Sequence, residues 1–170
     1  MKKLLIFLLS LFFISSSANA CQISRQTDAM SGDELIRLWV EGQPNKALGF
    51  PYTNQHVSIL SYTCPEGPLW MYADTNNLSG GDIESGYTKY SVRIKLDDNL
   101  KNIGLAQTWG SNWFELVDLP LWQNSIFTSR EIINTLKETS SILIELPVYS
   151  EGSVIYTFDT VGFNSSQCPS

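Results

Sequence analysis

The residues best able to do chemistry in this chain do not form a catalytic pattern. His56 is the single histidine, and a hydrolytic triad needs a histidine beside both a nucleophile and an orienting acid. The sequence has no Gly-x-Ser-x-Gly nucleophile turn and no Cys-x-x-Cys pair. We therefore interpret His56 as an exposed or capping residue at the start of a strand, and we expect no catalytic residues.

An acidic segment from Asp74 to Glu84 carries oxygen atoms of the kind that calcium prefers. It does not fit an EF-hand loop, because Leu78 stands at a ligand position, Ser79 replaces the turn glycine and no glutamate occupies the twelfth position. The segment therefore predicts a solvated loop, with no metal and no cofactor. Asp82 and Glu84 are candidates for contacting a basic partner.

Three cysteines, Cys21, Cys64 and Cys168, follow an N-terminal stretch that has the pattern of a signal peptide. If Cys21 is the first mature residue and carries a lipid anchor, Cys64 and Cys168 remain to form a disulfide. Closing a loop of about 100 residues stabilises a fold by roughly 4.7 kcal/mol. In the alternative, the protein is soluble in the periplasm and Cys21 is free or pairs with another protein.

The signal-peptide prediction covers residues 1–20, with Lys2 and Lys3 before an apolar run and small residues at the cleavage site. The formal net charge of −6 becomes −8 when these two lysines are removed. Such a surface repels nucleic acid and anionic lipid, so neither is expected as a partner, and only a lipid on Cys21 would hold the protein at a membrane. The predicted location is the periplasm.

Aromatic residues and one arginine are the main candidates for partner binding. The chain has five tryptophans and seven tyrosines, which can pack in a core or anchor a partner. We expect Trp70, Trp109 and Trp113 in the core and Trp122 at the surface. Arg93 is expected on a basic outer strand face with Lys89 and Lys95, where it could meet a partner or a nearby carboxylate.

Alternation of apolar residues predicts several short strands, bounded by turn residues. These strands cover residues 56–63, 68–73, 87–96, 103–109, 113–117, 142–149 and 153–159. Capped helical spacing predicts two helices, over 31–42 and from residue 128 or 129 to about 138. Residues 43–53 are expected to be a connector, and residues 74–86 a mobile loop.

Strands outnumber helices, which favours a mainly β fold: an antiparallel β-sandwich or curled sheet with one or two short helices. The expected organisation is a signal peptide at 1–20, an N-terminal helix and connector at 21–54, and a sandwich domain closed by a disulfide at 55–170.

The order of several short motifs resembles a known family. The motifs are Leu60-Ser-Tyr-Thr-Cys64, Leu69-Trp-Met-Tyr72, Ser91-Val-Arg93, Trp109, the helix near Arg130 to Leu136, Phe158-Asp159 with Gly162-Phe163, and Cys168. Over roughly residues 56–168 they resemble the small periplasmic accessory proteins of bacterial type VI secretion, the VasI type. That family tends to carry a second cysteine near the mature N-terminus, which is missing here. The resemblance implies an accessory role in an envelope machine and no catalytic residue.

Three functions are consistent with these features. The first is a non-enzymatic exported accessory protein that binds another envelope protein, with a link to type VI secretion. The second is a periplasmic immunity or inhibitor protein that blocks a toxin or cell-wall hydrolase through acidic loops. The third is an enzyme that acts on cell-wall glycan through two facing carboxylates.

Overall fold

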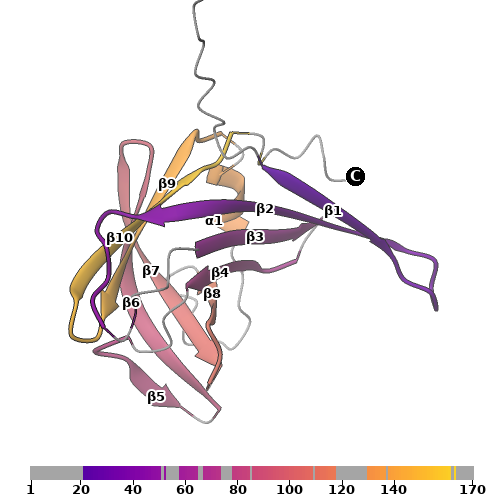
Figure 1. Cartoon of the computed structure of the whole chain (residues 1–170). Helices are drawn as coiled ribbons and strands as arrows, with labels where there is room; N and C mark the ends of the chain where they lie inside the picture. The colour runs from indigo at the N-terminus through magenta and orange to yellow at the C-terminus, as the bar shows by residue number, and fades with distance from the viewer. Residues whose placement is uncertain are drawn as a thin grey trace, which may run out of the picture.

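The computed structural model describes residues 21–50, 52, 58–64, 67–73, 78–84, 86–108, 110–117, 130–136, 138–161 and 163. These residues form a mainly β fold, as predicted (Figure 1). The strands are β1 (Gln22–Thr27), β2 (Glu34–Pro44), β3 (Ser58–Cys64), β4 (Leu69–Ala73), β5 (Asp82–Glu84), β6 (Tyr87–Leu96), β7 (Asn99–Thr108), β8 (Trp113–Val117), β9 (Ser141–Val148) and β10 (Gly152–Asp159). The helix described is α1 (Arg130–Leu136).

Eight of the described strands close into an antiparallel barrel. Going round the wall, the order is β2, β10, β9, β6, β7, β8, β4, β3 and again β2. The ring closes at β2, which pairs with β3 from Ile36 to Gly42 and with β10 from Gly42 to Pro44. The predicted sandwich or curled sheet is therefore wrong, because both would leave open edges where the barrel wall is paired.

The helix predicted over residues 31–42 is also wrong, because β2 occupies most of that segment. Ile36, Leu38 and Val40 are buried, while their neighbours Arg37 and Trp39 face outward, which is the period of a strand. Pairing with β1, β3 and β10 overrides the local cap and helix signals. Since β2 is part of the barrel wall, the boundary expected at residue 54 does not separate it from the rest of the sheet.

The predicted strands and the second helix are otherwise confirmed in outline. The hairpins β3–β4 and β9–β10 pair as expected, β6 spans the predicted residues, and α1 lies within the predicted helix. The loop predicted over 74–86 is only partly right: Asp82–Glu84 form β5 on the edge of β6, and Leu78 makes a bridge with Val148. Residues 74–77 and His56 lie outside the described part.

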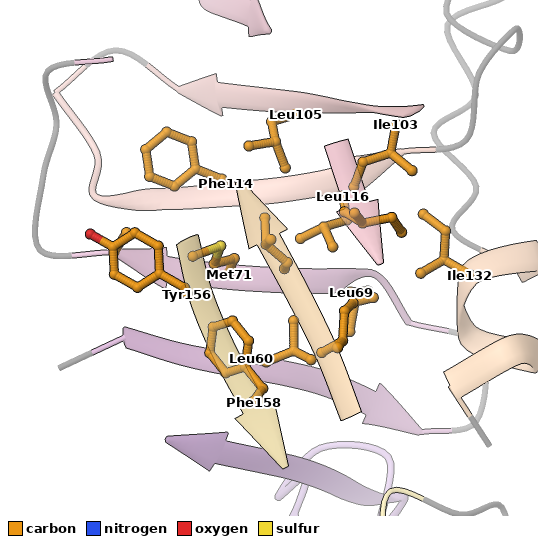
Figure 2. Packing of buried hydrophobic residues seen from close by; sticks show 14 of the residues in the cluster. Leu60, Leu69, Met71, Ile103, Leu105, Phe114, Leu116, Ile132, Tyr156 and Phe158 are labelled. Carbon is orange, nitrogen blue, oxygen red and sulfur yellow. The ribbon is translucent and has the colours of Figure 1, made fainter. Parts of the chain in front are cut away.

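The interior of the barrel is filled by apolar side chains from alternate positions of each strand (Figure 2). Phe114 from β8 and Phe158 from β10 have no exposed surface, and Ile132 from α1 points toward the same cluster. Ile133 and Leu136 of α1 are buried as well, so the helix contributes one whole face to the core. Inward positions are thus used for packing, which leaves outward positions for other roles.

β1 and β2 form a hairpin whose turn end extends away from the barrel (Figure 1). All six residues of β1 are exposed, and β1 pairs with Glu34–Trp39 of β2. The exposed pair of Arg25 and Glu34, 3.1 Å apart, links the two strands. No helix in the described part is long and apolar enough to cross a membrane.

Asp97 fastens the β6–β7 turn to the start of β9. Its φ is +47°, a region that aspartate adopts more readily than most residues. Its carboxylate accepts hydrogen bonds from the Ser140 hydroxyl at 2.9 Å and from the backbone N–H groups of Ser140 and Ser141, both at 3.1 Å. These bonds, the hydroxyl first, lower the pKa of Asp97 against an opposing effect of desolvation.

We expect Asp97→Ala to lower the melting temperature by about 2–5 °C and Asp97→Asn to lower it less, since asparagine keeps one acceptor and tolerates positive φ. Because the folded pKa lies below the unfolded value, the carboxylate stabilises the fold above the unfolded pKa of about 3.9 and this is lost as the pH falls through the folded pKa. The difference in melting temperature between wild type and Asp97→Asn should therefore be largest near neutral pH and should shrink as the pH is lowered below the unfolded pKa of about 3.9. A difference that stays constant with pH would contradict the assigned role.

Candidate functional site

Aromatic side chains gather on the outer side of the wall formed by β4 and β8. Leu69, Met71 and Ala73 of β4 are buried, so the alternate residues Trp70 and Tyr72 face outward. In β8, Phe114 and Leu116 point inward and Trp113, 37% exposed, points outward. The prediction that Trp70 and Trp113 belong to the core is therefore wrong, and Trp109 lies outside the described residues.

The position of Trp113 is set by its neighbours. Its ring lies 5.2 Å from that of Tyr72 at an interplanar angle of 60°, and the two residues are paired across β4 and β8. The Trp113 backbone N–H donates to the Ser111 hydroxyl at 3.0 Å, and the Gln107 side chain donates to the Ser111 carbonyl at 2.7 Å. Trp113 is thus held at the rim of the wall without being buried.

A pocket of about 430 Å³ lies on this outer face, within the range of small-ligand sites. Two indoles, four hydroxyl-bearing side chains and one guanidinium surround it. The lining residues are Arg37, Ser61, Thr63, Trp70, Thr108, Ser111 and Trp113. Strand register explains part of this grouping, because Arg37 of β2 pairs with Thr63 of β3 and Ser61 of β3 pairs with Trp70 of β4. Five strands (β2, β3, β4, β7 and β8) and the turn that holds Ser111 therefore build the pocket.

Arg37 differs from the six other cations whose side-chain contacts are described. No hydrogen bond or ion pair joins its side chain to another described residue, and the residue is exposed. Lys89 and Lys101 have interacting partners. The other four form ion pairs at 3.1, 3.8, 2.6 and 3.4 Å: Arg25 with Glu34, Lys46 with Glu151, Arg93 with Glu145 and Lys95 with Asp98. In an acidic protein, an arginine without a carboxylate partner at a pocket is a binding candidate.

Glu115 lies next to Trp70 in the strand register but does not line the pocket. Its side chain is half-buried on the outer face, and this burial raises the pKa of its carboxyl. The charged form is thus disfavoured in the folded state.

We expect Glu115→Gln to raise the melting temperature at pH 7 by about 1–3 °C. Because the folded pKa is raised, the stability linked to this group is present below the unfolded pKa of about 4.3 and is lost as the pH rises through the folded pKa. The gain in melting temperature, measured by calorimetry, should therefore be present at pH 7 and vanish near pH 4. The exposed Asp82→Asn serves as control, and a gain that persists at pH 4 would rule out charge burial as the cause.

Arg93, predicted as a partner-binding candidate, is engaged within the protein. Its Nε and Nη2 atoms both lie 2.6 Å from the Glu145 carboxylate, across the β6–β9 pair. A hydrogen bond from the Ser153 hydroxyl and the nearby Arg93 charge lower the pKa of Glu145, against an opposing effect of desolvation. The predicted basic face is also smaller than expected, because Lys89 is buried and its Nζ lies 5.4 Å from the centre of the Tyr87 ring.

The remaining candidates are scattered. Asp82 is exposed on β5 and pairs with Lys89 in the register, and Glu84 ends the same strand. Cys21 is a free thiol, half-buried against the core, and burial raises its pKa despite a backbone hydrogen bond from Trp39. Cys64 is buried at the end of β3. Trp122 and Cys168 lie outside the described residues, so the surface role of Trp122 and the bridge between Cys64 and Cys168 stay predictions.

The sequence reasoning missed Arg37, Trp70 and Trp113 as site residues. A usable signal existed for Trp113, since Glu115, two residues further on, marks the polar face of Trp-Phe-Glu-Leu-Val. Leu-Trp-Met-Tyr-Ala has large apolar side chains on both faces, so it gave no such signal for Trp70. No such signal existed for Arg37, because its segment was assigned to a helix.

The described residues contain no group of three or more histidine, cysteine, aspartate or glutamate side chains able to hold a metal ion. The chemistry of the pocket is therefore that of aromatic surfaces, hydroxyl groups and one guanidinium. Comparisons with protein-family models, with curated proteins and with solved structures found no match for this chain.

Proposed function

We propose that this protein is a non-enzymatic exported accessory protein that binds another envelope protein through the outer pocket of β2, β3, β4, β7 and β8. The observation that carries the proposal is the outward position of Trp70 and Trp113 around a pocket of about 430 Å³. Tryptophan and arginine are the residue types most enriched among the anchors of protein interfaces. Neither indole is needed to fill the barrel, which inward side chains already pack.

The motif resemblance supports a type VI secretion apparatus as the setting, with the protein in the periplasm. A lipid on Cys21 would place the barrel close to a membrane, because β1 begins at the next residue. An unmodified Cys21 would leave the protein soluble.

The test is capture of partners from crosslinked cell envelopes with tagged protein, read by mass spectrometry. We expect one envelope protein to be enriched with wild type, to be lost with Trp70→Ala and to be kept with Tyr149→Ala. Tyr149 is a matched control because it is an aromatic residue, 65% exposed, that does not line the pocket. A Cys21→Ser variant, which cannot carry the lipid, shows whether capture of the partner depends on anchoring to the membrane. Equal capture by Trp70→Ala and wild type would reject the pocket as the binding surface.

A periplasmic immunity or inhibitor protein is the second candidate, and one observation favours it. The hairpin of β1 and β2 extends from the barrel and carries Asp28, Asp33 and Glu34 at its tip, around a shallow pocket of about 240 Å³. An acidic projection of this kind complements the basic cleft of a nuclease or hydrolase. Capture of one such enzyme, lost in Asp33→Asn with Glu34→Gln but kept in Trp70→Ala, would favour this function.

A further inference from the structure

The atoms that line the outer pocket are suited to a ligand that accepts hydrogen bonds. Arg37 offers guanidinium donors, and Ser61, Thr63, Thr108 and Ser111 add hydroxyl groups. None of the described lining residues is acidic or carries a side-chain amide. A neutral sugar presents many hydroxyl donors and is usually met by carboxylate or amide acceptors, so it fits this lining less well than an anion does.

The charge and shape of the pocket further restrict the chemical class of ligand that it can bind. Arg37 has no hydrogen-bond or ion-pair partner among the described residues, so a carboxylate from a ligand can form a bidentate, charge-assisted pair without displacing one of them. Trp70 and Trp113 provide flat apolar surfaces at the same pocket, and an apolar group of the ligand can pack against them. A pocket of about 430 Å³ has room for two or three amino-acid side chains.

We infer that the pocket binds a peptide segment in which an acidic residue stands next to an aromatic or aliphatic one, with the carboxylate on Arg37 and the apolar side chain against Trp70 and Trp113. This rests on the proposed function and names the chemistry of the partner. Backbone carbonyl groups of the bound peptide accept hydrogen bonds from the hydroxyl groups that line the pocket.

The test is titration of purified mature protein with two capped peptides that differ in one group, containing Phe-Asp or Phe-Asn, followed by calorimetry. We expect the Phe-Asp peptide to bind about tenfold or more tightly than the Phe-Asn peptide. Arg37→Gln should remove this difference in affinity because it weakens the binding of the Phe-Asp peptide alone. Arg37→Lys should keep part of the difference. Arg93→Gln is the matched control, because Arg93 is an exposed arginine on β6 that does not line the pocket.

Folding of Arg37→Gln is checked by its melting temperature, which should match that of wild type because the side chain has no hydrogen bond or ion pair to lose within the described part of the chain. Equal binding of both peptides, or no saturable binding of Phe-Asp at low-millimolar concentration, overturns the inference. So does Arg37-dependent binding of an oligosaccharide of glucuronic acid without binding of the peptides. If the peptides fail while envelope capture still depends on Trp70, this inference fails and the proposed function stands.

Discussion

Phe158→Ala is expected to lower the free energy of unfolding by about 3–5 kcal/mol, the largest effect on stability that we predict. Phe158 has no exposed surface and pairs with Gly42 of β2 on one side and Ile142 of β9 on the other. Its ring lies at the seam where β10 and β2 close the barrel, so its loss leaves a cavity that the paired wall cannot easily fill. Urea denaturation followed by tryptophan fluorescence measures the effect, and Phe158→Leu should cost less.

Gly42 provides an internal check on this prediction. A Cβ atom at this position would overlap the Phe158 ring and come within 2.9 Å of the Ser58 hydroxyl oxygen. Gly42→Ala should therefore destabilise the wild type by about 1–3 kcal/mol through overpacking. Combined with Phe158→Leu, it should cost clearly less than the sum of the two single changes, because the smaller side chain makes room. Strict additivity would show that the two residues do not share this space.

Trp70→Ala is expected to weaken partner binding by about 30-fold or more, the largest effect on function that we predict, because buried tryptophan anchors contribute about 2 kcal/mol or more. Trp70 is half-buried between Ser61 of β3 and Glu115 of β8, in the middle of the pocket wall. It is therefore held in place before a partner arrives, which lowers the entropic cost of binding.

The measurement is the dissociation constant of the captured partner from surface-immobilised wild type, Trp70→Ala and the Tyr149→Ala control. The control should stay within about twofold of wild type, as expected for a substitution outside the interface. A melting temperature close to that of wild type would show that Trp70→Ala remains folded. A loss of less than about threefold would place the anchor elsewhere on the surface.

The candidate site could be predicted only in part, and Arg93 and Arg37 show why. Both arginines lie in strands at outward positions, with similar local sequence character. Arg93 meets Glu145 because β6 pairs with β9, more than 40 residues further along the chain. Arg37 meets no carboxylate of the described residues because the strands beside it, β1 and β3, place Ser24 and Thr63 opposite it. Such differences depend on register between distant strands, which local patterns do not contain.

Local sequence patterns were enough to locate α1, to show that the fold is mainly β and to identify the strands from β3 to β10 other than β5, which falls in the segment predicted as a loop. Alternation of apolar residues carries this information, because it reports which residues of a segment can share one buried face. It failed at β2, where capping residues and closely spaced apolar residues suggested a helix. Local propensity favours a helix there, but the strand form has the lower free energy because it pairs with both β3 and β10.

Closure of the sheet, and which face of β4 it encloses, depend on contacts between strands that are distant in the sequence. In β4 both faces carry large apolar side chains, so either face could have been buried on the evidence of the segment alone. Closure of eight strands settles the choice, since the enclosed space is already filled by residues such as Leu69, Met71, Phe114 and Phe158. Trp70 and Trp113 are left on the outside because a packed interior of fixed volume has no room for them.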